Sequence, residues 1–283
     1  MKFRQKYLSL CIAALLAGAS PAIAAPSLGT AADFAVLSAA PGGLGAVTCT
    51  DTNITGAVGS SGAPASVTQT NCTISGGVVA PVPGGVLTSF DRAYDALAGQ
   101  SCDTFLTGTL AGITLTPGVY CFAAAATLTG TLTLSGGLND TWLFKVGTSG
   151  TGALTGTNFS VVMENGASAC NVTWWVAEAA TMTTSNFQGT ILAGAAITAT
   201  GVAPTSPFEG RALAKAGVTL TNVAFLGCTG GSIGGTAKPK CNQGVGNGFE
   251  GCDPGNSNQG NPFRSNDERG GIPGAPGRMG GNK

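Results

Sequence analysis

Apolar residues alternate with threonine in several short segments of the chain. In each of them every second side chain is apolar and the intervening threonines fall on the opposite side; the clearest segments are 106–110, 127–129, 131–134 and 218–221. A period of two is that of a β-strand with one buried face. Glycines separate the segments, as expected where a chain turns sharply. The pattern predicts a mostly β domain made of short strands and tight corners.

One segment has a helical period instead. Between residues 87 and 99 the large apolar side chains recur at three- and four-residue intervals, at Leu87, Phe90, Tyr94 and Leu97. Such spacing places them on one side of a helix. Thr88 or Ser89 is placed to cap its start and Gly99 to end it. The pattern predicts one long helix over 87–99, whose other side carries Asp91, Arg92 and Asp95 into solvent.

An internal repeat covers the end of the predicted β region. Residues 186–200 align with residues 207–221 at an offset of 21, and Ala203-Pro204-Thr205 looks like a corner insertion, so the unit has about 18 residues. A repeat this short, with strands and glycine corners, is typical of one coil of a β-solenoid, in which stacking buries the inner faces. A β-sandwich, the alternative, is expected to have less regular spacing and more aromatic residues.

The two ends of the chain differ in composition from its middle. Residues 1–24 begin with Lys2, Arg4 and Lys6, continue with a short apolar run and end in a small-residue cleavage signature, which predicts a secretory signal peptide. Residues 229–283 are rich in Gly, Asn and Pro and poor in large apolar residues, which predicts a flexible tail. Residues 25–228 are then one domain. Oxygen-bearing side chains in the tail could coordinate calcium, but their spacing does not match an EF-hand and we favour a solvated spacer; they are Asp253, Asn256, Asn258, Asp267 and Glu268.

Cysteine usage agrees with export. Removal of the signal peptide leaves eight of the nine cysteines, an even number in an oxidising compartment, which favours four disulfides. Eight cysteines allow 105 pairings in principle. Pairing each cysteine with its neighbour is the simplest hypothesis, and it gives Cys49–Cys72, Cys102–Cys121, Cys170–Cys228 and Cys241–Cys252. Thiolate metal ligation is disfavoured because the chain has no Cys-x-x-Cys pair.

Composition excludes several classes of function. The chain has 13 basic and 13 acidic residues, only 9% of it is charged, and it has no histidine. Nucleic-acid binding needs a basic surface, and Ser-His-Asp or Cys-His catalysis needs histidine. A polysaccharide-cleaving solenoid needs paired carboxylates, whereas the acidic residues here are scattered singly. We therefore expect no enzymatic activity, catalytic residue, cofactor or metal, and no membrane span, because no segment beyond the signal approaches 18 uninterrupted apolar residues.

Stacked coils would place equivalent threonines in rows at the inter-strand distance of about 4.7–4.9 Å. Threonine has a stiff side chain, so such a row loses little entropy when it orders something against it. An uncharged array of methyls and hydroxyls suits a lattice of water better than an ion. The alternative is that threonine is used only as a soluble strand former.

Several motifs together resemble the microbial ice-binding (antifreeze) family. The resemblance lies in the opening segment 28–37, the helix over 89–99, and five further stretches: 115–120 with 128–134, 142–147, 166–174 and 209–214. It covers about residues 28–228. It implies an irregular, right-handed, three-faced β-solenoid with the helix packed alongside, in which the N-terminal segment inserts into the stack so that coils do not follow chain order.

The resemblance also implies a site. Active members bind ice through one flat face, often with Thr-[Ala/Gly]-x-[Thr/Asn] steps. Residues 155–158 fit that pattern and 183–186 fit it loosely, while 198–200 beside 219–221 is a second candidate row. The predicted ice-binding residues are Thr155, Thr157, Asn158, Thr183, Ser185, Asn186, Thr198, Thr200, Thr219 and Thr221.

Two functions remain open from the sequence. The favoured one is a secreted, monomeric protein that adsorbs to ice and acts outside the cell or in the periplasm. The alternative is an extracellular structural or adhesive solenoid of the same fold, which binds a cell surface or a polymer and has no ice activity.

Overall fold

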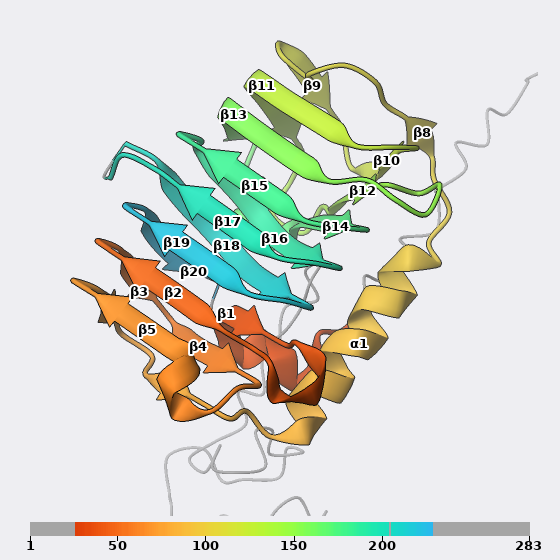
Figure 1. Ribbon diagram of the computed structural model, residues 1–283. Coiled ribbons are helices and arrows are strands. Elements are labelled where there is room, and N and C mark those ends of the chain that lie inside the picture. The colour runs from red at the N-terminus through yellow and green to blue at the C-terminus, as the bar shows by residue number, and fades with distance from the viewer. Residues whose placement is uncertain (1–25, 204, 229–283) are drawn as a thin grey trace, which may run out of the picture.

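The computed structural model describes residues 26–203 and 205–228. The predicted signal peptide 1–24, the tail 229–283 and the predicted Cys241–Cys252 pair lie outside the described residues. Within them, two parallel β-sheets wind into a solenoid with one α-helix along its side (Figure 1). The predicted mostly β, three-faced solenoid with a single flanking helix is confirmed.

The first side of the solenoid belongs to an eight-stranded sheet. Its strands, in spatial order, are β5 (Val67–Thr70), β2 (Val47–Thr50), β19 (Val218–Thr221), β17 (Ile197–Thr200), β15 (Ala180–Thr183), β13 (Leu154–Glu164), β11 (Ala126–Ser135) and β9 (Ile113–Leu115). The long strands β13 and β11 continue past the first corner, because Ser160 of β13 forms a parallel bridge with Asn186 on the next side. Apolar residues of these strands point inward, as their alternation predicts.

The other two sides belong to a twelve-stranded sheet that bends. One path through it runs β6 (Thr73–Ile74), β3 (Asn53–Thr55), β20 (Ala224–Gly227), β18 (Pro207–Ala214), β16 (Phe187–Ala193), β14 (Val172–Val176), β12 (Trp142–Val146), β10 (Gly118–Phe122) and β8 (Thr104–Phe105), and beside it lie β1 (Phe34–Ser38), β4 (Ala57–Ser60) and β7 (Val78–Val79). Strand β18 pairs with β20 through its first half and with β1 through its second half. The bend lies at Gly210, where φ is 146° and a Cβ would collide with the Gly189 carbonyl. The bend divides this sheet into two parts. We call the part in which β18 pairs with β20 the second side of the solenoid, and the part in which β18 pairs with β1 the third side.

The coils are not stacked in chain order, as the family resemblance implies. Strand β2 pairs with β19, and β1 lies between β18 and β4. The last C-terminal coil, made by β19 and β20, therefore obtains its third side from the N-terminal strand β1. In contrast, the predicted repeat stacks directly, with Phe187 opposite Phe208 and Ile197 opposite Val218.

Helix α1 (Gly84–Ala98) carries the chain from β7 at one end of the stack to β8 at the other (Figure 1). It buries Val86, Phe90, Ala93, Tyr94 and Leu97, while Asp91, Arg92 and Asp95 are exposed. The predicted start is wrong: the helix begins at Gly84, and the Thr88 and Ser89 hydroxyls donate to carbonyls one turn back instead of capping it. Gly99 ends it, as predicted. Short 3₁₀ turns complete the fold: η1 (Gly29–Asp33), η2 (Pro41–Gly43), η3 (Pro64–Ser66) and η4 (Ala169–Asn171).

A column of aromatic rings fills the interior of the solenoid. Successive coils contribute one ring each, and neighbouring centroids lie between 4.0 and 5.6 Å apart, in the order Tyr120, Phe144, Trp174, Phe187, Phe208 and Phe225. Stacked and tilted ring pairs add to the free energy gained by burying their area. The interior is therefore packed as one continuous core.

Three of the four predicted disulfides are present, namely Cys49–Cys72, Cys102–Cys121 and Cys170–Cys228. The neighbour-pairing hypothesis is confirmed for these six cysteines. Each disulfide joins segments that the coil stacking already brings together, so the bridges reinforce the fold.

Lys145 joins the solenoid to the end of helix α1. Its side chain is 4% exposed, and the ammonium donates hydrogen bonds to the carbonyls of Ala98 (2.8 Å) and Gln100 (2.5 Å). A cation is favourable at a helix C-terminus, where carbonyls lack helical partners. Burial lowers the pKa of Lys145.

Replacing Lys145 with methionine is expected to lower the free energy of unfolding by about 1.5–3 kcal/mol, because two hydrogen bonds from a charged donor are lost and the Ala98 and Gln100 carbonyls lose this partner. Chemical denaturation measures the change. Arg92→Met, which removes a cation from the exposed side of the same helix, should change it by less than about 0.5 kcal/mol. Equal losses in the two variants would contradict a capping role.

Candidate functional site

The first side of the solenoid carries an unbroken row of threonines. Parallel pairing places seven of them directly opposite one another on consecutive strands, and we call this row the first threonine file: Thr68, Thr48, Thr219, Thr198, Thr181, Thr155 and Thr127. No register shift interrupts the file. Its members come from β5, β2, β19, β17, β15, β13 and β11.

A second row runs beside it, two residues further along each strand. Six threonines pair in register in this second threonine file: Thr70, Thr50, Thr221, Thr200, Thr183 and Thr157. Thr129 follows Thr127 in the same way, but the β11–β13 register shifts there. The Thr129 amide donates to the Thr109 carbonyl. The segment that contains Thr109 has its own Thr-x-Thr step, Thr-Gly-Thr at 107–109. We call the surface formed by the two files the threonine face.

The threonine face is open to solvent and uncharged. Every threonine of the two files is exposed or half-buried, and each first-side strand between β5 and β11 lacks Asp, Glu, Lys and Arg in its Thr-x-Thr step. None of these hydroxyls donates or accepts a hydrogen bond within the described part of the protein. The hydroxyls and methyls are therefore available to whatever contacts this side.

The spacing of the face is that of a β-sheet. Neighbours in a file are separated by the inter-strand distance of about 4.7–4.9 Å, and the two files by two residues of strand, about 6.5 Å. Because threonine is β-branched, its χ1 is restricted. The arrangement presents a nearly rectangular grid of paired methyl and hydroxyl groups, held by backbone hydrogen bonds.

Corner residues in the left-handed region end the face along one edge. The residue after the second-file threonine has a positive φ in most coils: Asn71, Asp51, Asn222, Thr184 and Asn158, with φ between 48° and 56°. Asn and Asp tolerate this region better than other non-glycine residues. Asn158, predicted to contact ice from the face, lies at this corner and not in either file.

Ser185 is a correction to the predicted site. It is 6% exposed, its hydroxyl donates to the Thr183 carbonyl (2.9 Å), and it accepts from the Phe159 amide (3.2 Å). Thr52 makes the same two-residue bond to Thr50 and is also buried. These side chains fix the turn, so Ser185 is a buried corner residue and cannot contact an external surface. Asn186 lies beyond the same corner, at the start of the second side.

The corner insertion does not interrupt the files. Ala203 and Thr205 lie between the end of β17 and the start of β18, and Thr200 still pairs with Thr221. The insertion is held by bonds of its own, including the Thr205 hydroxyl to the Val202 carbonyl (2.6 Å). The extra residues are therefore accommodated beyond the edge of the face.

Seven of the ten predicted site residues lie in the two files, and the sequence argument missed the remaining members. The missed threonines are Thr48, Thr50, Thr68, Thr70, Thr127 and Thr181. Each belongs to a step in which an apolar or alanine residue precedes Thr-x-Thr. A search for that four-residue step would have found every strand that contributes threonines to the files, and we call each such strand a tier of the threonine face. The family pattern Thr-[Ala/Gly]-x-[Thr/Asn] is narrower, and its fourth position falls at the corner.

The second side lacks this regularity. Outward residues paired across its strands are Gln188, Glu209, Leu226 and Thr55, which differ in size and charge. A groove of about 520 Å³ lies on this side, and Glu209 is the one acidic side chain among the described residues that line it. Helix α1 covers part of the third side, where Trp175, Leu192 and Leu213 are buried against it. The threonine face is thus the one repetitive open surface of the described solenoid.

Residues 26–203 and 205–228 contain no group of three or more His, Cys, Asp or Glu residues placed to hold a metal ion. None of their helices is long and apolar enough to cross a membrane.

The disulfide Cys49–Cys72 secures the end of the threonine face. Cys49 lies between Thr48 and Thr50 with its side chain inward, and its partner lies just after Thr70 in the terminal coil. Replacing both cysteines with alanine is expected to lower the free energy of unfolding by about 2–4 kcal/mol. Amide exchange should then rise in β5 and β6 before it rises in β17. Uniform exchange along the stack would contradict a local role for this bridge.

Comparison with known proteins identifies the family of this chain. Residues 30–225 match the family model described as ice-binding-like. The chain is 34% identical over 219 residues to ice-binding protein K3-B1 of Typhula ishikariensis, a match that covers 67% of this chain and 87% of that protein. It is 32% identical over 185 residues to an ice-binding protein of Flavobacterium frigoris, covering 59% of this chain and 64% of the relative.

Solved structures give the same result. The crystal structure of an ice-binding protein from an Antarctic biological consortium superposes with a TM-score of 0.59 at 29% identity, covering 71% of this chain and 90% of that one. The family match spans more than half of the chain and includes every member of both threonine files, which lie between Thr48 and Thr221. The protein therefore belongs to the ice-binding-like family.

Proposed function

We propose that this protein binds ice, and that it does so through the threonine face. The observation that carries the proposal is the uninterrupted register of the two threonine files across six consecutive strands, β5, β2, β19, β17, β15 and β13. Family membership supports ice as the ligand, and the geometry supports this side as the place of contact.

The chemistry of the face suits an ordered water lattice. Methyl groups restrict the hydration layer between the hydroxyls, and the hydroxyls can donate and accept hydrogen bonds at regular intervals. Their side chains are already confined by β-branching and by packing in the files, so little conformational entropy is lost on contact. A charged side chain would instead hold water in a radial shell that competes with the lattice.

The proposal includes how the protein acts. Adsorbed molecules block growth of the ice surface between them, so no bond is made or broken and no catalytic residue is needed. We further propose that the chain is exported by the signal peptide 1–24 and acts as a monomer outside the cytoplasm. The three disulfides support an oxidising compartment.

The test uses the purified mature chain. It should produce a gap between melting and freezing temperatures and keep fine ice grains from coarsening, and it should be enriched in a slowly grown ice hemisphere. An unrelated protein of similar size, at the same molar concentration, is the control. Grains that coarsen as fast as in the control, together with exclusion from the ice, would refute ice binding.

A further inference from the structure

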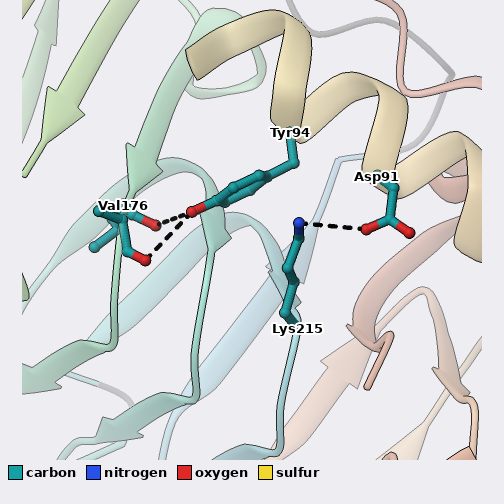
Figure 2. A network of polar contacts seen from close by, with 5 residues as sticks. Asp91, Tyr94, Val176 and Lys215 are labelled. Atoms are coloured by element: carbon teal, nitrogen blue, oxygen red, sulfur yellow. Dashed lines mark hydrogen bonds and ion pairs between the residues drawn. The ribbon is translucent and has the colours of Figure 1, made fainter. Parts of the chain in front are cut away.

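Tyr94 of helix α1 reaches the corner between the third and first sides. Its hydroxyl donates to the carbonyls of Val176 (3.0 Å) and Ala177 (3.3 Å), as Figure 2 shows. The Val176 carbonyl also accepts the amide of Gly194 in the next coil (2.9 Å). One tyrosine hydroxyl therefore shares an acceptor with the backbone bond that links two successive corners.

The contacts of Tyr94 extend over three successive coils. Gly194 lies so close that a Cβ there would come within 2.5 Å of the Tyr94 oxygen. In the following coil, the Lys215 ammonium lies 4.2 Å from the centre of the Tyr94 ring and 3.5 Å from Asp91 Oδ1 (Figure 2). The three corner positions, Ala177, Gly194 and Lys215, are equivalent, because Val176, Ala193 and Ala214 pair in register just before them.

These corners lead directly into the first threonine file. Each of them precedes one of its threonines by four residues: Ala177 precedes Thr181, Gly194 precedes Thr198, and Lys215 precedes Thr219. The three threonines are consecutive members at the centre of the file. A shift of one corner along the strand direction would displace its threonine from the plane and register of its neighbours.

We propose that Tyr94 is a positioning residue of the ice-binding surface, one that aligns the three central tiers of the threonine face by fixing their corners from outside the solenoid. This inference rests on the proposed function of that face. Helix α1 then contributes to ice binding without touching ice, since Tyr94 is 8% exposed and lies on another side of the stack.

The tyrosine hydroxyl remains a donor under all ordinary conditions. Burial, with a smaller contribution from the charge of Asp95, raises the pKa of Tyr94 to about 12. The two carbonyls that it contacts can only accept hydrogen bonds. A phenylalanine would keep the ring and its contacts with Trp175 and Lys215 but would leave these carbonyls without their shared donor.

The experiment compares Tyr94→Phe with Tyr120→Phe in the full mature chain. Tyr120 is a matched control, because it is equally buried at 8% and its hydroxyl also donates to a backbone carbonyl, that of Thr116 (2.7 Å). That bond lies within a single coil and spans no corner of the threonine face. Both variants should lower Tm by similar amounts, about 2–4 °C.

Only Tyr94→Phe should lose ice activity, by roughly half or more at a temperature where both variants are fully folded, because a loosely held site fits its ligand less well. It should also speed amide exchange at Ala180, Ile197 and Val218, whose amides bond to the neighbouring coil just before the three threonines. Full activity of Tyr94→Phe, or equal losses in both variants, would overturn the proposal.

The exchange measurement separates this inference from the proposed function. If the unmodified protein shows no ice activity, ice binding fails, and the exchange rates alone decide whether Tyr94 aligns the corners. Unchanged exchange at the three amides would overturn the positioning role even in a protein that binds ice.

Discussion

Replacing Thr198 with tyrosine is expected to reduce ice activity by about tenfold or more, equivalent to at least about 1.4 kcal/mol of adsorption free energy. Thr198 lies at the middle of the first threonine file, between Thr181 and Thr219. A phenol ring there would stand above the plane of both neighbours and hold a rigid lattice away from several tiers at once. Thermal hysteresis and ice-affinity enrichment measure the effect.

The fold should tolerate this change. The Thr198 side chain points outward and makes no hydrogen bond within the described protein, so the free energy of unfolding should change by less than about 0.5 kcal/mol. Thr55→Tyr is the matched control, since Thr55 is an exposed, outward threonine in β3 on the second side. Retention of full activity by Thr198→Tyr, or an equal loss in Thr55→Tyr, would place the ice-binding surface elsewhere.

Replacing Trp174 with alanine is expected to have the largest effect on stability, a loss of about 3–5 kcal/mol. Trp174 is fully buried, stacks on Phe144 at a centroid distance of 4.0 Å, and contacts Phe187 at 5.4 Å. Its indole N–H also donates to the Gln188 carbonyl (3.1 Å). Removal of the ring opens a cavity in the middle of the aromatic column and leaves that carbonyl without its partner.

Calorimetry or denaturant unfolding checks this expectation, and the loss should lower Tm by about 10 °C or more for a domain of this size. Phe105→Ala provides the comparison, because Phe105 is 64% exposed at the edge of the stack and should contribute little. A loss below about 1 kcal/mol for Trp174→Ala would mean that the column is not the continuous core described above.

The features that could be predicted from the sequence are those set by a repeat between neighbouring coils or by the hydrophobic period of a single segment. Residues 186–200 and 207–221 stack in the predicted register, because neighbouring coils of similar length place equal positions opposite each other. The helix face around Phe90 and Tyr94 followed from local period alone. The resemblance to known sequences supplied the rest of the architecture.

Other parts of the site could not be obtained in this way. Thr155 and Thr181 are paired although they lie 26 positions apart in the sequence. This offset differs from that of the predicted repeat, because the intervening loops differ in length. Thr48 and Thr68 join the files only because the N-terminal coils stack on β19, a contact between distant parts of the chain. Ser185 was assigned to the surface because alternation does not reveal where a corner turns a side chain inward.

The position of β1 governs when the molecule can fold. Strand β1 pairs with β18, and the Ser38 hydroxyl bonds to the Ala216 carbonyl, 178 residues away in the chain. The earliest strand thus lacks one of its two neighbours until nearly the whole domain exists. Native contacts of such long range slow folding. A chain that cannot close its stack before its last coils are made stays unfolded during its synthesis, which is compatible with the export proposed above.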